Sequence, residues 1–364
     1  MTIDVHGHLS PPESRRRYPM PRTLGQVEEM ISAKLDRGVR TTIVGSPVGG
    51  GAMVPLPGVD NYAQSEDDLS RHDEWLAGLV DRHPERLRAY VYVNPFGGAA
   101  HLRRVARTVR EPQFVGLIAN TSVAGRYLDA PEAEDFFALA AELDRPVLLH
   151  PPAMPAAGSG LDNLLLIEQL GRFNDITVGM ACCLLGGWLD RFPGLKLIAP
   201  AAGGALGLLG ERLDRVMAPA HWDGGGGPTR PGPAPPRLMR RLVALARPPS
   251  AYLPRIWVDT ATPSASAVKL AVRVFGPDRV LFGTDSPPMP HSEPGATLDL
   301  LDRLGLPGAT RDGICEGNAR ALFGDRLPPS SAGTAPATTF PPPTVGSGPG
   351  RPAGRDDPVA GLSG

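Results

Sequence analysis

Short runs of apolar residues recur along most of the chain, separated by longer segments of mixed polarity. Eight of these runs have the length of strands and are continuously apolar rather than alternating. Continuous apolar runs are typical of parallel strands that are covered on both faces. The runs are TIDVH from Thr2, VRTTIVG from Val39, LRAYVYV from Leu87, FVGLIA from Phe114, PVLLH from Pro146, LKLIA from Leu195, RIWVD from Arg255 and VLFGTD from Val280.

Segments of helical character lie between most of these runs. Two examples are PEAEDFFALAAEL from Pro131 and SASAVKLAVRVF from Ser264. Repeated strand–helix units predict an α/β fold, a distorted TIM (β/α)8 barrel over residues 1–325, with a doubly wound open sheet as the alternative. No Gly-x-Gly-x-x-Gly turn follows the first strand, and the glycines after Val48 lack the Lys-Ser/Thr of a phosphate-binding loop, which weakens a nucleotide-binding interpretation.

Two segments are rich in proline and glycine. The stretch APAHWDGGGGPTRPGPAPP from Ala218 predicts a long flexible excursion between the sixth and seventh strands. From about Leu327 the chain contains too few apolar residues to offset the entropy lost on ordering, so residues 326–364 are predicted to form a disordered tail.

The composition is that of a soluble globular protein, with 364 residues, of which 41% are hydrophobic and 21% charged. A net charge of -1 and a pI near 6.7 argue against nucleic-acid and anionic-membrane binding, and favour a small-molecule partner. The N-terminus resembles no signal peptide and no run is long enough to span a membrane, so we expect a cytoplasmic protein. Three cysteines give no disulfide framework.

Histidines and a carboxylate stand at the ends of three predicted strands, where a barrel carries its functional side chains. His6 and His8 end the first strand, and their spacing directs both side chains to the same side of it. His150 ends the fifth strand and Asp285 follows the eighth. Three imidazoles and a carboxylate form a ligand set suited to one divalent metal, zinc or another first-row metal.

Other polar residues are weaker candidates. The segment SRRRYPMPR follows His8 and could bring an arginine beside an anionic substrate, and Asn120 and Thr121 could form the wall of a pocket or simply a turn. The remaining histidines fit surface or capping roles, although His221 and His291 lie in loops that could fold over the barrel mouth. The candidate arginines are Arg15, Arg16, Arg17 and Arg22.

Several motifs together resemble a known family. IDVHGHL, VGLIANTSVAGRYLDAPEAEDFFALAAELDRPVLLHP, GGWLDRFPGLKLI, GGALGLLGERLDR and VLFGTDSPP occur in order over residues 1–325. They resemble the amidohydrolase-2 branch of the metal-dependent amidohydrolases, which includes aminocarboxymuconate-semialdehyde and resorcylate-type decarboxylases. The resemblance implies a homodimer and non-oxidative loss of carbon dioxide from a small aromatic or enolic carboxylic acid. It also implies metal ligation by His6, His8, His150 and Asp285, with Asp285 as the catalytic proton carrier.

The chain departs from this family after the sixth strand. Where the family carries a catalytic histidine, the sequence PAAGG places Ala201, which can neither accept nor donate a proton. Such a group typically contributes about 10²- to 10⁴-fold to a rate. The departure leaves three hypotheses open: a metal-dependent carboxy-lyase, which we favour; a metal-dependent hydrolase or a repurposed cyclase or isomerase; and a non-catalytic barrel that retains metal. The excursion around Trp222 is the expected place of contact between subunits.

Overall fold

A computed structural model describes residues 1–217 and 245–330 of the chain. The described residues up to Pro328 form one compact unit. The excursion with His221 and Trp222 lies outside the described residues, as does most of the tail, so both remain predictions. In the described part, no helix is long and apolar enough to cross a membrane.

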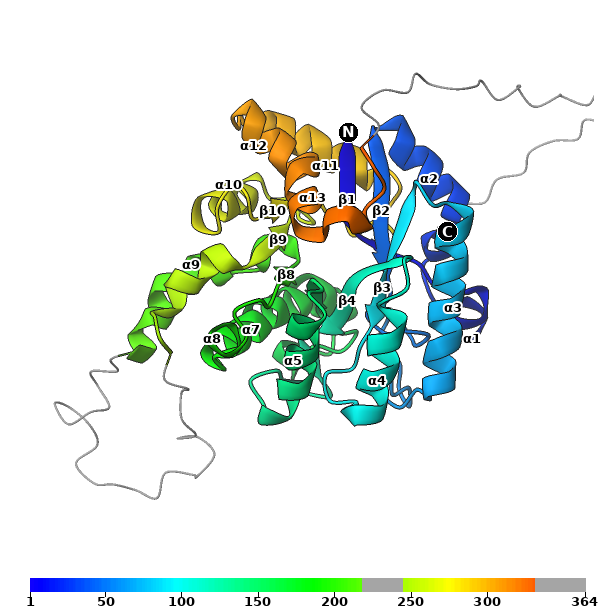
Figure 1. Ribbon diagram of the computed structural model, residues 1–364, viewed down its shortest axis with the longest axis horizontal. Coiled ribbons are helices and arrows are strands. Elements are labelled where there is room, and N and C mark those ends of the chain that lie inside the picture. Colours follow the sequence, from blue (N-terminus) through cyan, green and yellow to red (C-terminus); the bar gives the residue numbers. More distant parts are fainter. Residues whose placement is uncertain (218–244, 331–364) are drawn as a thin grey trace, which may run out of the picture. The chain divides into compact units, whose positions relative to one another are not determined.

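Eight strands form one parallel sheet in the order β1-β2-β3-β4-β7-β8-β9-β10, with the helices around it (Figure 1). Strands that follow one another in sequence are neighbours throughout, which excludes the doubly wound alternative. The ring closes where the Val5 amide of β1 donates to the Phe282 carbonyl beyond β10, at 2.9 Å. The distorted TIM barrel predicted from the sequence is therefore confirmed.

All eight predicted strands are present. They are β1 (Thr2–His8), β2 (Val39–Gly45), β3 (Leu87–Tyr92), β4 (Phe114–Asn120), β7 (Val147–His150), β8 (Leu197–Ala199), β9 (Trp257–Asp259) and β10 (Val280–Leu281). A two-stranded antiparallel hairpin, β5 (Ser122–Val123) and β6 (Arg126–Tyr127), follows β4 and was not predicted.

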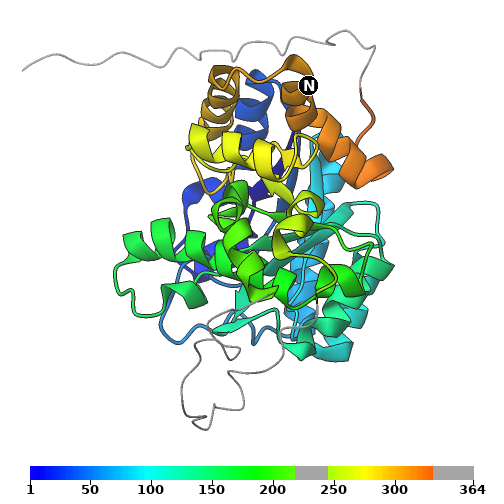
Figure 2. The same cartoon turned by 90° about the vertical axis from the view of Figure 1, so that its left-hand side faces the viewer.

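The helices form the outer layer. They are α1 (Pro12–Arg17), α2 (Val27–Asp36), α3 (Glu66–Arg82), α4 (Gly98–Thr108), α5 (Glu134–Glu142), α6 (Leu164–Leu166), α7 (Arg172–Leu185), α8 (Trp188–Arg191), α9 (Leu206–Leu213), α10 (Ala265–Val274), α11 (Glu293–Arg303), α12 (Gly308–Asp312) and α13 (Asn318–Phe323). The two predicted helical segments correspond to α5 and α10, and Ser264 caps α10 by accepting from the Ala267 amide. Helices α2 and α11 lie side by side in both views, joined by an ion pair between Arg37 and Asp299 (Figure 2).

The strands are buried on both faces, which explains their continuous apolar sequence. One cluster joins residues of the strands to the surrounding helices. A second gathers residues from strands all around the ring, among them Ile3, Ile118 and Leu281, together with Phe323 of α13. Only the barrel interior can bring side chains from opposite strands together, so this second cluster fills it.

Candidate metal centre

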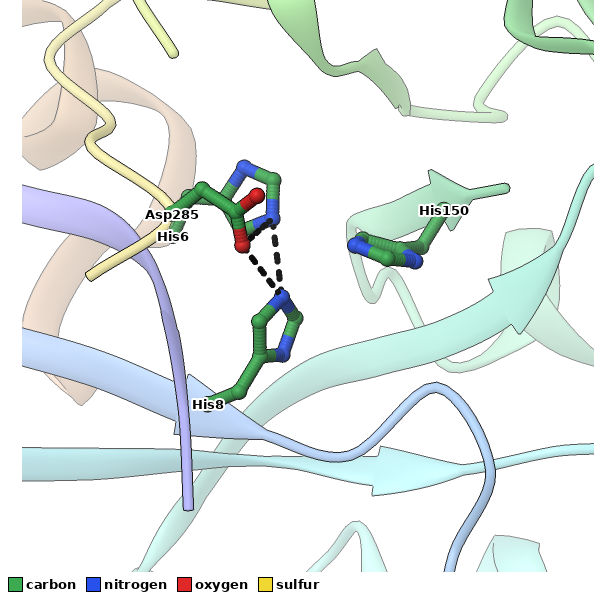
Figure 3. A group of neighbouring side chains, drawn as sticks. All are labelled: His6, His8, His150 and Asp285. Carbon is green, nitrogen blue, oxygen red and sulfur yellow. Dashed lines mark hydrogen bonds and ion pairs between the residues drawn. The ribbon is translucent and has the colours of Figure 1, made fainter. Parts of the chain in front are cut away.

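His6, His8, His150 and Asp285 come together at the carboxyl ends of the strands (Figure 3). One ligand atom from each lies within 4.8 Å of all the others. The Nε2 atoms of His6 and His8 are 3.1 Å apart, and the Asp285 Oδ1 atom is 3.0 Å from His8 Nε2. The three imidazole planes are nearly perpendicular to one another, at 84° to 88°. The structure thus brings together all four residues that the sequence selects as ligands.

The opposite nitrogen of each imidazole is held by an oxygen acceptor. His6 Nδ1 lies 2.7 Å from Asp259 Oδ2, and His8 Nδ1 lies 3.1 Å from the Gly45 carbonyl. His150 Nδ1 lies 2.8 Å from the Pro151 carbonyl. An acceptor at Nδ1 keeps the proton on that atom and leaves the Nε2 lone pair for a cation, which is how metal-binding histidines are usually oriented.

The donor set fits a divalent cation better than it fits a proton. A single proton could be shared between the Nε2 atoms of His6 and His8, but it would leave the Asp285 Oδ1 atom without a donor. That oxygen is buried and has no hydrogen-bond partner among the described residues. Because buried acceptors rarely remain unpaired, a cation bound to all four atoms accounts for the arrangement.

The protonation preferences of these groups agree with cation binding. Burial lowers the pKa of His6, but the charge and hydrogen bond of Asp259 raise it more, to about 9, so this position stabilises positive charge. Burial lowers the pKa of His8, and lowers that of His150 well below its usual value, which favours the neutral imidazoles that bind metals. Burial raises the pKa of Asp285, but the neighbouring His6, His8 and Arg172 together lower it more, and the net pKa is below the usual value.

Asp259, at the end of β9, is a positioning residue that the sequence analysis missed. Its Oδ2 atom holds His6, and its Oδ1 atom accepts from the amides of Ala201, at 2.8 Å, and Ala261, at 3.0 Å. Gly283 makes room for it, since a Cβ there would lie 2.8 Å from the Asp259 Cβ. The signal was present in the sequence, because RIWVD ends a strand with a carboxylate just as VLFGTD does.

Replacing Asp259 by Asn is expected to weaken metal binding by about 10- to 100-fold, because the amide cannot reproduce the charged acceptor at His6 Nδ1. Competition titration of the metal against a chromogenic chelator measures the change. The matched control is Asp278→Asn, whose carboxylate is exposed and pairs with Arg279. Unchanged metal affinity in Asp259→Asn would refute the positioning role.

A second buried carboxylate, Asp4, ties the ligand-bearing segments together. Its Oδ1 atom accepts from the amides of His6 and Thr284, and its Oδ2 atom accepts from the Thr284 hydroxyl, at 2.6 Å, and from Lys34 Nζ, at 2.8 Å. This network fixes β1 against the loop that carries Asp285. Asp285 itself has a positive φ of 55°, a conformation that is costly for residues other than glycine and is found at functional sites.

Three of the four ligands, His6, His150 and Asp285, border a cavity of about 220 Å³. His6, His150 and Asp285 lie on one side of it, and apolar and charged residues complete the wall. The rest of the lining is Pro151, Glu168, Gln169, Arg172, Phe173, Ile176, Pro200, Ala201, Ala261, Thr262, Pro263, Thr284, Met289 and Glu293. The arginine in this lining is Arg172, which the sequence analysis did not select.

The structure places the weaker candidates away from this cavity. Among the described lining residues none is Arg15, Arg16, Arg17, Arg22, Asn120, Thr121 or His291. Arg16 and Arg17 instead border a separate hollow beside His72. The arginines after His8 therefore do not line the cavity at the metal ligands, and their role in binding an anionic substrate stays a prediction.

The side chains of Asn120 and Thr121 connect neighbouring segments of the fold. The Asn120 amide group donates to the His150 carbonyl and accepts from the Tyr62 hydroxyl, and the Thr121 hydroxyl donates to Asp175. His291 makes no hydrogen bond through its ring within the described part of the chain.

The turn after β8 consists of two alanines followed by two glycines, so its side chains are small or absent. Four consecutive residues, Ala201 to Gly204, have positive φ angles between 51° and 78°. Ala201 is half-buried and lines the metal cavity, so this position contributes space where an imidazole is expected from the resemblance.

Comparison with known proteins agrees with the fold. The model of a family described as Amidohydrolase matches residues 3–324. A 6-methylsalicylic acid decarboxylase of Penicillium expansum is 26% identical over 342 residues, which are 88% of this chain and 95% of the relative. A γ-resorcylate decarboxylase of a Polaromonas species is 26% identical over 73% of this chain and 78% of the relative.

Solved structures share the same fold. A 2,6-dihydroxybenzoate decarboxylase from Rhizobium superposes with a TM-score of 0.67 at 20% identity, covering 88% of this chain and 98% of that one. A dihydroxybenzoic acid decarboxylase from Polaromonas, with bound manganese and the inhibitor 2-nitroresorcinol, has a TM-score of 0.68 at 21% identity, over 88% and 96% of the two chains. Because the family model spans nearly the whole described barrel, the chain belongs to this amidohydrolase family.

Proposed function

We propose that the protein is a metal-dependent carboxy-lyase that removes carbon dioxide from a small aromatic carboxylic acid without oxidation. The observation that carries the proposal is the cluster of three imidazoles and Asp285 beside a small, partly apolar cavity that His6, His150 and Asp285 line. The curated relatives are decarboxylases of aromatic or enolic acids, which supports the same reaction here. The cavity is smaller than the about 300–1,000 Å³ of typical ligand pockets, which favours a single-ring substrate.

His6, His8, His150 and Asp285 would hold one divalent cation. When bound, the cation supplies Lewis acidity, polarising a carboxylate and a neighbouring hydroxyl of the substrate. Manganese in the structure of a related decarboxylase supports manganese, while the three-histidine set is equally typical of zinc. The metal that the protein carries is therefore proposed as zinc or manganese.

Asp285 is the proposed proton carrier. Its Oδ1 atom faces the histidines, and its side chain is 32% exposed, so the second oxygen is accessible from the cavity. Because the pKa of Asp285 is low, its carboxylate would first accept the proton of the substrate hydroxyl and then deliver it to the ring carbon that bears the carboxylate. The carbon–carbon bond would then break, its electron pair would return to the ring and the ring oxygen, carbon dioxide would leave, and a proton from water would restore the hydroxyl.

A hydrolase, or a cyclase or isomerase, is the alternative. Ala201 favours the lyase over hydrolysis, because the missing imidazole would serve the activation of water most directly. The mass of the product separates these reactions: loss of carbon dioxide, gain of water or no change.

A homodimer is proposed as the assembly. Exposed leucines follow one another on α6 and the helical turn after it, where Leu164, Leu165, Leu166 and Leu170 are 48% to 72% exposed. A contiguous apolar patch of this kind is typical of an interface between proteins. The homodimer and the cytoplasmic location stay predictions.

Treatment with a chelator is expected to abolish carbon dioxide release from hydroxybenzoic acids, and stoichiometric manganese or zinc is expected to restore it. Elemental analysis before and after treatment, with carbon dioxide measured by a coupled assay, provides the test. A panel of hydroxybenzoic and enolic acids is used because the substrate is unidentified. Carbon dioxide release that survives complete metal removal would refute the proposed function.

A further inference from the structure

Arg172 opens helix α7 and lines the cavity that contains the metal ligands. Its side chain is 15% exposed, and its Nη1 atom pairs with Glu168 Oε2, one turn earlier, at 3.0 Å. The reaction proposed above gives this guanidinium no role.

Most donors of Arg172 are unused. A guanidinium carries five N–H groups, and within the described chain its only hydrogen bond is the one to Glu168. Nε and Nη2 therefore remain without a protein partner in a largely enclosed place. Because a guanidinium in such a place binds carboxylates through two parallel hydrogen bonds, the free edge is suited to an anionic group of a ligand.

The surroundings of Arg172 leave room for that ligand. Phe173 and Ile176 provide an apolar wall, and Ala201 lies in the same lining where a larger side chain would fill the space. The turn after β8 packs against the start of α7, since a Cβ at Gly204 would lie 3.1 Å from the Phe173 carbonyl. A sphere of the cavity's volume is about 7 Å across, the scale of one substituted benzene ring.

We propose that Arg172 binds a second carboxylate of the substrate, so that the preferred substrate is a small aromatic acid with acidic groups at both ends. One carboxylate and its neighbouring hydroxyl lie at the metal ligands, and the other lies at the free edge of Arg172. This inference rests on the proposed function and assigns Arg172 as the residue that selects diacids over monoacids.

The charges in the cavity are compatible with a diacid. Glu168 is already paired with Arg172, and Asp259 is paired with His6. The other two lining carboxyl groups are Asp285, which lies beside His6 and His8, and Glu293, whose pKa is raised by burial and then by the charge of Asp285. The positive charge of Arg172 and of the bound metal thus faces few uncompensated negative charges.

Calorimetric titration of the manganese-loaded full-length protein with two matched probes tests the inference. The diacid is 4-hydroxyisophthalate and the monoacid is 2-hydroxybenzoate, which lacks only the second carboxylate. We expect the wild-type protein to bind the diacid at least about tenfold more tightly, since charged hydrogen bonds contribute on this scale. Arg172→Met should weaken diacid binding about 10- to 100-fold and monoacid binding less than about threefold.

Three further variants separate charge from structure. Arg172→Lys should retain part of the diacid preference, because it keeps the charge without the two-bond geometry. Glu168→Gln should keep the preference, since it leaves the guanidinium in place. The exposed Arg303→Met is the matched control and should behave as wild type.

Equal affinity of the wild-type protein for the two probes, absence of binding, or an equal loss for both probes in Arg172→Met would overturn the inference. Failure of the proposed function looks different. In that case no acid in the panel releases carbon dioxide, while the diacid preference in the binding experiment can persist. Conversely, carbon dioxide release with no diacid preference removes the role of Arg172 and leaves the lyase.

Discussion

Replacing Asp285 by Asn is expected to lower the rate of carbon dioxide release by about 10²- to 10⁴-fold, the usual contribution of a positioned proton carrier. An amide of the same shape cannot carry the proton to the ring carbon. It also offers a neutral oxygen in place of the carboxylate that faces His8 at 3.0 Å. Turnover is measured with saturating metal, so that weaker metal binding does not cause the loss by itself.

Metal content distinguishes the two roles of Asp285. A variant that still binds one equivalent of metal but has lost turnover supports proton transfer, whereas turnover close to wild type would refute it. Asp302→Asn is the control, since this carboxylate is 55% exposed and pairs with Arg311 on the surface.

Replacing Asp4 by Ala is expected to lower the free energy of unfolding by about 3–5 kcal/mol, because it leaves the buried Lys34 ammonium group unpaired. The Lys34 side chain is 3% exposed and Asp4 is fully buried, so water cannot replace the lost partner. Asp4 also accepts from Thr284, and its loss frees the loop that leads to Asp285. Denaturant unfolding monitored by circular dichroism measures the change.

Two comparisons show whether the loss comes from the stranded charge. The double variant Asp4→Ala, Lys34→Met should recover part of the stability, because it removes the unpaired ammonium group as well. Asp299→Ala removes an exposed pair with Arg37 and should cost less than about 1 kcal/mol. A loss in Asp4→Ala no larger than in Asp299→Ala would contradict the importance of the network.

The barrel could be predicted from the sequence because its strands are buried on both faces. That burial makes each strand a continuous apolar run, and the filled interior around Ile118 is the physical cause. The hairpin of β5 and β6 escaped prediction because each strand has only two residues, too few to show a pattern. Its neighbouring residues are instead held by side-chain bonds to Asp175.

The ligand cluster was accessible to sequence reasoning because β-strand ends converge at one rim. The same rule would have selected Asp259, had strand-end carboxylates been weighed as partners of histidines as well as ligands. Arg172 was not accessible in this way, because it comes from a helix whose position over the rim depends on tertiary packing. The arginines after His8 had the right charge and sequence position, but they do not line the metal cavity, and Arg16 and Arg17 border a separate hollow instead.

The hydrogen bond to Asp259 is donated by the main-chain amide of Ala201 and does not involve its side chain. The main chain holds the support of His6, so this contact does not depend on the side chain at 201, while the φ of 51° there disfavours β-branched residues. A substitution at position 201 can thus change the lining of the cavity while the main-chain contact to Asp259 is kept. A saturation library there would explore new substrate preferences and new proton-transfer groups on an unchanged scaffold.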